Sequence, residues 1–515
     1  MWSIWTFSVV VLALTTGTYL LLFLSKDGLP DATGTQKIKS PLDDYGFGPE
    51  KQLLIFEVEH AKIEMKDKIF ARMQWSTTSG TTNQTVGIEI KGSGPDERRK
   101  LNFAFEIWDA SDETQSPCIS IETCEDDKAE LFDFGEKYED YVLRGGYNEP
   151  TFVRDSVASQ LAGGILQHTM VEVLFRRPDG ALTYEGVYIL YPAIQRRVLE
   201  KRLDWSNKGK AECDEEPDEE DNSAMIGEFT VEGKNGRKAP CSEFDLDVKM
   251  RYPKCDMAQC FYDRLHHFFS VLTLKNTSEV HLNLDSFVDT YLAEMLMRED
   301  DFPYTSQYFY ISPDDNALNS GPRWDYDKEF WRVCPTDTWD LFNLHYYNRG
   351  PIDFWVHLGK HQPFIDRVNA AATTIDTNFN ITKQLIEKRR GQLANGFFDK
   401  NIHRWNTFGK QMYSRTENIL YAVYGTDAGA RPTMEQELDR MAAYFESRTV
   451  WMKNNLPVKS FGVRHFDMVM WVVIYCIPLI LAGIFVVMTS FLFWHSRNTK
   501  DTPRGTYAPV QALKY

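Results

Sequence analysis

The sequence has no surplus of positive charge. It contains 57 lysine and arginine residues against 74 aspartate and glutamate residues, and its formal net charge is −17. Nucleic-acid binding requires a basic face that contacts phosphates, and none is evident along this chain. Part of the acidity is concentrated in residues 212–221, a run that could bind calcium but more commonly forms a solvated loop. We therefore expect no nucleic-acid partner.

Two long stretches contain no charged residue at all. They cover residues 2–25 and 468–494, and each exceeds the ~20 residues that an apolar helix needs to cross the hydrocarbon core of a bilayer. Segment 495–515 is rich in lysine and arginine, which is typical of a cytosolic tail. The sequence therefore predicts two membrane-spanning helices, with residues 26–467 in the lumen of the secretory pathway or outside the cell.

The first apolar stretch lacks two features of a cleaved signal peptide, a basic n-region and a clear small-residue cleavage site. Its apolar run is also longer than the usual core of a signal peptide. This favours a retained signal anchor, while a cleaved signal peptide stays open. Because Lys26 is offset by Asp27, the flanking charge does not by itself exclude a cytosolic position for the globular part.

Cysteines are few, with eight in 515 residues. Those between the two apolar stretches could form close disulfides or remain buried thiols. The close pairs would be Cys118 with Cys124, Cys213 with Cys241, and Cys255 with Cys260. Glycosylation sequons occur at Asn83, Asn276 and Asn380. Both patterns permit a disulfide-bonded glycoprotein in the secretory pathway without proving that topology.

The chain between the apolar stretches divides into a linker and one large domain. Residues 26–50 are rich in glycine and proline and predict a linker, and the domain covers residues 51–457. Its first part contains short strand-like runs at 53–58, 85–90, 102–107, 170–175 and 183–191. Helical spacing follows at 285–299 and 433–455, the latter opening on a capping-box pattern. We expect an α+β fold with no internal repeat.

The most informative stretch for chemistry follows helix 285–299. Asp301 comes directly after that helix, and a strand at 308–311, a turn and a return strand lead to Asp325. This order predicts two acidic loops at the same end of a hairpin. Phosphoryl transfer needs one carboxylate that acts on the attacking hydroxyl and another that holds Mg²⁺ against the nucleotide phosphates. Acidic residues also line ordinary loops and caps, so the carboxylates alone do not establish this chemistry.

The same stretch resembles the signature of the CotH kinase family, the spore-coat-protein-H-like secreted kinases. The resemblance is carried by Asp301, by Ser306-Gln-Tyr-Phe-Tyr and by Gly321-Pro-Arg-Trp-Asp-Tyr-Asp327. Further matches follow in order along the chain, at 143–148, 154–155, 186–190, 249–253 and 446–451. The resemblance implies a two-lobed, protein-kinase-like domain with a sheet-rich N-lobe and a helix-rich C-lobe.

The resemblance also implies a role for each matching residue. Asp301 would be the catalytic aspartate, and the metal ligands would be Asp325, Asp327 and Ser306. ATP would contact Lys100, Lys91, Gly92 and Gly94. Gly92 and Gly94 could instead form a simple hairpin turn, and Arg98 or Arg99 could replace Lys100 as the relevant cation. Trp324 and Tyr326 fit core packing better than ligand contact.

Two departures from the family pattern leave the activity open. Pro192 stands where the family usually has a glutamate, and Lys91 replaces an arginine that could bind phosphate in a bidentate way. The first hypothesis is a kinase that uses ATP with Mg²⁺ or Mn²⁺ and phosphorylates serine, threonine or tyrosine of secreted or cell-surface proteins. The alternative is a catalytically inactive surface, adhesion or structural protein on the same scaffold. In both cases the expected location is a membrane of the secretory pathway or the plasma membrane.

Overall fold

A computed structural model describes much of the large domain. The described residues, apart from short gaps within these ranges, are 37–38, 52–109, 126–206, 224–229, 237–238, 247–252, 282–326, 354–408, 433–456 and 488. Residues 1–342 and 347–460 form one compact unit, and residues 343–346 with 461–515 form a second. The features below all belong to the first unit.

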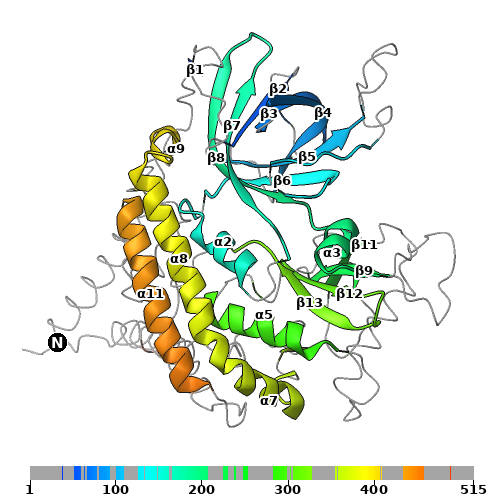
Figure 1. Ribbon diagram of the computed structural model, residues 1–515, viewed down its shortest axis with the longest axis vertical. Coiled ribbons are helices and arrows are strands. Elements are labelled where there is room, and N and C mark those ends of the chain that lie inside the picture. The colour runs from blue at the N-terminus through cyan, green and yellow to red at the C-terminus, as the bar shows by residue number, and fades with distance from the viewer. Residues whose placement is uncertain are drawn as a thin grey trace, which may run out of the picture. The chain divides into compact units, whose positions relative to one another are not determined.

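The first sheet closes on itself through seven strands (Figure 1). Its order is β8 (Leu182–Pro192), β6 (Asp140–Arg144), β5 (Asn102–Trp108), β4 (Gly80–Lys91), β3 (Ile69–Thr77), β2 (Leu53–Val58) and β7 (Thr169–Arg176). Antiparallel pairing of β7 with β8 completes the ring, and β2 pairs with β7 in parallel. The short strand β1 (Lys37–Ile38) also pairs with β8.

Aromatic side chains fill part of the space inside this closed sheet. Phe103 and Phe105 are two residues apart on β5 and therefore lie on the same face. The ring centroid of Phe56 lies 5.3 Å from that of Phe105 and 5.5 Å from that of Phe175, and Phe103 lies 5.3 Å from Phe175. All four side chains are buried. Their burial supplies hydrophobic stabilisation to the closed sheet.

A second, smaller sheet lies later in the chain. Its order is β10 (Arg237–Lys238), β11 (Asp247–Tyr252), β9 (Met225–Phe229), β12 (Gln307–Ile311) and β13 (Leu318–Arg323), and its neighbouring strands are antiparallel. Strands β12 and β13 form a hairpin. Because β12 also pairs with β9, a segment far upstream fixes one side of this hairpin.

Helices pack on one another beside these sheets. They are α2 (Val153–Gln160), α3 (Arg196–Arg202), α5 (Leu284–Met297), α7 (Gln362–Ala371), the 3₁₀ turn η4 (Ala372–Thr374), α8 (Ile375–Ala394), α9 (Asp399–Trp405) and α11 (Met434–Asn455). Helix α11 lies along α8, as Figure 1 shows, and also contacts α5. The predicted capping box is confirmed: Thr433 accepts from the N–H of Gln436, and the Gln436 side chain accepts from the N–H of Thr433.

The predicted fold class is wrong. The first sheet is a closed ring of seven strands, and the part of the chain predicted to be a helix-rich lobe contains the second sheet as well as helices. This arrangement does not fit a two-lobed kinase-like domain. The physical reason is that the pairing of β9 with β12, which joins the two parts of the second sheet, spans about 80 residues, and local periodicity does not reveal such a pairing.

The expected membrane-spanning helices are not part of the fold as described. Among the residues with a described structure, no helix combines the length and apolar character needed to span a bilayer. The two apolar stretches, residues 2–25 and 468–494, lie outside the described residues except for Met488. So do the tail 495–515 and all of the linker 26–50 except β1, and the predicted domain bounds stay predictions.

Candidate functional site

The β12–β13 hairpin brings Ser306 and Asp325 together. Ser306 directly precedes β12 and Asp325 follows shortly after β13, and Gln307 pairs with Arg323 across the hairpin. The Ser306 hydroxyl donates a hydrogen bond of 3.1 Å to Asp325 Oδ2. The antiparallel pairing therefore turns two positions separated by a whole hairpin into direct neighbours.

Both residues have left-handed backbone conformations. The φ angle is 62° at Ser306 and 73° at Asp325. Residues other than glycine seldom adopt such angles, and they persist where surrounding contacts hold the backbone in place. Such conformations concentrate at functional sites, so their occurrence at two bonded residues directs attention to this hairpin end.

A buried arginine and a second aspartate hold Asp325. Arg144 Nη1 lies 2.5 Å from Asp325 Oδ1, and Arg144 Nε lies 3.2 Å from Asp155 Oδ2. Asp155 Oδ1 also accepts a hydrogen bond of 3.0 Å from the backbone N–H of Tyr326. The exposed fraction of the side chain is 6% for Arg144 and 9% for Asp155 but 29% for Asp325. Asp325 is thus the member of this cluster that solvent and ligands can reach.

A pocket lies beside the hairpin end. Including its open part, it has a volume of about 310 Å³ and is lined by Thr290, Glu294, Phe302, Ser306, Gln307, Tyr308, Ser320, Gly321, Pro322, Arg323, Trp324 and Tyr326. Glu294 on α5 is fully buried, and it accepts a hydrogen bond from the Tyr326 hydroxyl. The Trp324 ring lies 5.3 Å from the Arg144 guanidinium carbon and packs edge-on against Tyr191. Trp324 and Tyr326 thus line the pocket and also pack against neighbouring side chains.

The donor set at this hairpin end suits a hard divalent cation. Mg²⁺ and Mn²⁺ prefer oxygen ligands, and Asp325 and Ser306 present carboxylate and hydroxyl oxygens next to each other. The contacts with Arg144 and Ser306 fix the orientation of this carboxylate, which can accept about four interactions when it is ionised. Two other proposed members of the site, Asp301 and Asp327, lie outside the described residues.

Lys100, the predicted phosphate-pairing lysine, is buried between the closed sheet and α9. Its Nζ donates to the carbonyl of Val187 and, over 2.8 Å, to Asn401 Oδ1, and it lies 4.4 Å from the centroid of the Tyr188 ring. Burial holds the pKa of Lys100 well below its ordinary value. Gly186 has a φ of 119°, and a β-carbon there would lie 2.5 Å from Asn401 Oδ1, so glycine allows α9 to approach. These contacts direct the Lys100 ammonium toward β8 and α9.

The remaining predicted residues fall into two groups. Lys91 and Gly92 are exposed at the end of β4, where Gly92 has a φ of 131°. Asn83 on β4 and Asn380 on α8 are also exposed. The others lie outside the described residues, namely Gly94, Asn276, Cys118, Cys124, Cys213, Cys241, Cys255 and Cys260. Their predicted roles stay predictions.

Arg144 and Asp155 were missed as site residues. Arg144 ends β6 and Asp155 lies in the first turn of α2, and Asp155 is separated from its partner Tyr326 by 171 positions. No local pattern links such distant positions. The only available signal was that residues 143–148 and 154–155 belong to the stretches that resemble the family.

Glu149 organises the N-terminus of α2, the helix that carries Asp155. Its carboxylate accepts hydrogen bonds from the N–H groups of Thr151, over 3.0 Å, and Arg154, over 3.2 Å. The first N–H groups of a helix have no intrahelical partner, so this contact satisfies one of them. Burial raises the pKa of Glu149 to about 7, and the nearby charge of Arg154 only partly offsets that effect.

This raised pKa predicts a pH-dependent stability. The pKa of Glu149 rises from 4.5 in the unfolded chain to about 7 in the folded protein, so its contribution is complete below pH 4.5 and is lost as the pH rises through 7. We expect this group to lower the free energy of unfolding by about 3 kcal/mol between pH 4.5 and 8. Urea denaturation at both pH values should show a smaller decline in Glu149→Gln. The exposed Glu387→Gln is the control, and equal declines in all three proteins would contradict the prediction.

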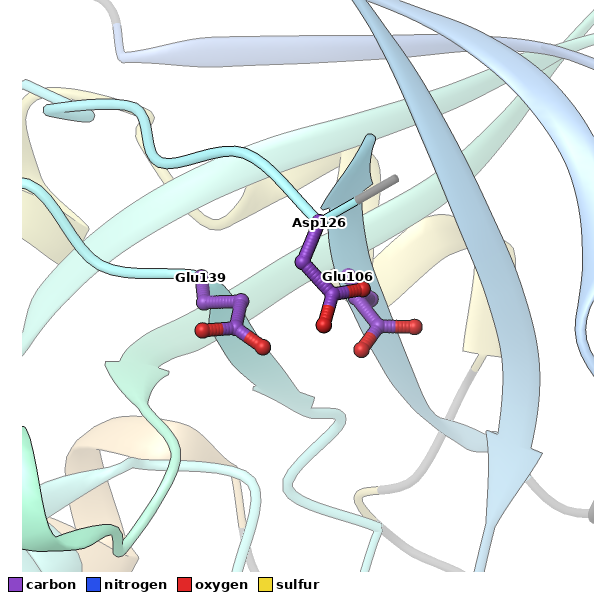
Figure 2. A group of neighbouring side chains, drawn as sticks. All are labelled: Glu106, Asp126 and Glu139. Carbon is purple, nitrogen blue, oxygen red and sulfur yellow. The ribbon is translucent and has the colours of Figure 1, made fainter. Parts of the chain in front are cut away.

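A separate acidic cluster lies on the closed sheet. Figure 2 shows Glu106, Asp126 and Glu139 pointing toward one another, and one carboxylate oxygen from each lies within 4.8 Å of the others. Burial raises the pKa of Glu139, and the charge of Asp126 adds to this effect. Lys68 Nζ lies 2.5 Å from Glu106 Oε2 and compensates part of the charge. Such clusters are common without a metal, and we assign no site to this one.

Comparison with known proteins agrees with the family resemblance that the hairpin motifs carry. The family model described as CotH kinase protein matches residues 88–452, which include Arg144, Asp155, Ser306 and Asp325. The comparison with curated proteins gives no match. The matched residues make up most of the chain and include the whole second sheet and, from the first sheet, β5 to β8 with the end of β4. The protein therefore belongs to the CotH kinase family.

Proposed function

We propose that this protein is a phosphotransferase that moves the γ-phosphoryl group of ATP to serine, threonine or tyrosine hydroxyls of secreted or cell-surface proteins. The observation that carries the proposal is the partly exposed Asp325 carboxylate, bonded to the Ser306 hydroxyl and to Arg144 at the end of the β12–β13 hairpin. Phosphoryl transfer depends mainly on positioned groups that hold the phosphates and stabilise their charge, and a fixed carboxylate with oxygen neighbours fits that task.

In this proposal Asp325 and Ser306 hold Mg²⁺ or Mn²⁺. The bound ion would neutralise negative charge on the nucleotide phosphates. Asp301 would accept the proton of the acceptor hydroxyl, whose oxygen forms the new bond to the γ-phosphorus while the bond to the β,γ-bridging oxygen breaks. ADP leaves with that bridging oxygen. The lysine and glycine residues 91 and 92, exposed at the end of β4, are proposed to contact the nucleotide phosphates.

Binding and transfer can be tested together on the full-length protein. ATP that binds only the folded state at 100 times its dissociation constant should stabilise the protein by about 2.7 kcal/mol, and thermal melting with ATP plus Mg²⁺ or Mn²⁺ measures this. Transfer of labelled γ-phosphate to secreted proteins tests the reaction. If ATP neither stabilises the protein nor donates its γ-phosphate, both with Mg²⁺ and with Mn²⁺, the proposed function is refuted.

One observation favours the alternative of an inactive surface or adhesion protein. Pro192 is buried at the end of β8 opposite Tyr141. The resemblance to the family predicts a glutamate at this position, and proline has no carboxylate. The same two assays separate the alternatives, because the inactive protein would fold but neither bind nor use ATP. Activity gained on Pro192→Glu by an inactive wild type would assign the loss of catalysis to this position.

We also propose that the domain faces the secretory lumen or the cell exterior. The sequon residues Asn83 and Asn380 are exposed and available for glycosylation. Removal of N-glycans by an endoglycosidase should increase the gel mobility of the protein expressed in eukaryotic cells. Unchanged mobility, together with unchanged mobility of Asn83→Gln and Asn380→Gln, would contradict use of these two sites.

A further inference from the structure

Arg144 connects three parts of the fold at the proposed metal site. It ends β6 of the closed sheet, and its guanidinium contacts Asp155 on α2 and Asp325 after β13. Asp155 in turn binds the backbone of Tyr326, the residue next to Asp325. The two aspartates therefore share one buried cation, and the segment 325–326 is attached to α2 both through that cation and directly.

We propose that Arg144, oriented by Asp155, is a positioning residue that holds the Asp325 carboxylate and sets its affinity for a divalent cation. The inference rests on the proposed function, because it concerns the carboxylate assigned to the metal there. Arg144 does not contact the substrate in this proposal. It acts through Asp325.

The geometry explains why an arginine serves here. A guanidinium is planar and presents donors in several directions, so its Nε reaches Asp155 while Nη1 reaches Asp325. A lysine ammonium is a single point charge on a flexible stem and would not reproduce both contacts in fixed directions. The left-handed backbone of Asp325 needs such restraint, because its φ of 73° is one that non-glycine residues seldom keep unaided.

The charges explain the effect on metal affinity. Arg144 contributes one positive charge, and Asp155 and Asp325 contribute one negative charge each, so these three side chains together have one net negative charge. Arg144 and a metal ion are both positively charged, and they compete for the same Asp325 carboxylate. Loss of the Arg144 charge should therefore strengthen metal binding, because a nearby positive charge is removed. Loss of the Asp155 charge should weaken it, because a nearby negative charge is removed while the guanidinium charge remains.

Mn²⁺ titration of the full-length protein, followed by the electron paramagnetic resonance signal of free Mn²⁺, tests these opposite signs. We expect Arg144→Gln to bind Mn²⁺ about tenfold more tightly than wild type and Asp155→Asn about tenfold more weakly. Turnover should fall in both variants, since Asp325 is no longer held in its working orientation, with little change in the KM for the acceptor protein. Arg144→Lys keeps the charge and should bind Mn²⁺ about as wild type does while losing turnover.

Controls distinguish this inference from the proposed function. Arg404→Gln removes another buried arginine, which faces Glu185, and should leave Mn²⁺ affinity unchanged. If Asp325→Asn binds Mn²⁺ as tightly as wild type, the proposed metal site itself is wrong. If Asp325→Asn loses Mn²⁺ while Arg144→Gln and Asp155→Asn do not shift the affinity in opposite directions, only the role of Arg144 is overturned. Should Arg144→Gln fail to fold, Asp155→Asn still tests the sign, because its amide oxygen can accept from Tyr326.

Discussion

Replacement of Asp325 with asparagine is expected to lower phosphoryl transfer by roughly a thousandfold, because the amide removes the negative charge that would hold the divalent cation. The fold should survive. The Asp325 side chain is 29% exposed, and Arg144 keeps its contact with Asp155 when Asp325 is neutralised. We expect the free energy of unfolding to fall by only about 1–2 kcal/mol.

Initial rates of γ-phosphate transfer and urea denaturation of the same preparations measure both parts of this prediction. Asp366→Asn is a matched control, because Asp366 is an exposed aspartate on α7 whose described contact is a hydrogen bond from Gln362 in the same helix. Its activity and stability should stay close to wild type. Equal activity of Asp325→Asn and wild type would remove Asp325 from the reaction.

Replacement of Arg448 with alanine is expected to destabilise the protein by about 3–5 kcal/mol. Arg448 on α11 is fully buried, and its Nε donates a 2.6 Å hydrogen bond to the carbonyl of Met295 in the last turn of α5. The last four carbonyls of a helix have no intrahelical partner, and a cation at that end also interacts favourably with the helix dipole. The variant loses this contact, the packing of the guanidinium 4.0 Å from the Trp451 ring centroid, and the volume of the side chain.

Chemical denaturation should detect this loss as a lower midpoint. Lys453→Ala is the control on the same helix, because Lys453 forms an exposed ion pair with Asp376 that should contribute at most about 1 kcal/mol. Since α5 leads directly to the segment that contains Asp301, Arg448→Ala should also lower activity at temperatures where the protein remains folded. A change in unfolding free energy no larger than that of Lys453→Ala would contradict the proposed anchoring of α5.

Local features of this protein could be predicted from the sequence. The run at 53–58 is β2 with the same bounds, and helix 285–299 corresponds to α5 at Leu284–Met297. The capping box at Thr433 and Gln436 was also correct. These features depend on residues at most a few positions apart. The spacing of apolar side chains and the capping contacts can therefore be recognised within a short segment. The family resemblance was equally local, because it rests on short motifs, and the match over residues 88–452 confirms it.

The tertiary structure decided which segments meet. Closure of the first sheet depends on β7, which pairs with both β2 and β8, and the second sheet depends on β9 pairing with β12. Lys100 reaches Asn401, 301 positions away, and Asp155 reaches Tyr326. An alternating pattern shows that a segment is a strand and which face is apolar, but it does not name the partner strand. Long-range packing likewise brings Arg144 to Asp155 and Asp325, and no local periodicity predicts those contacts.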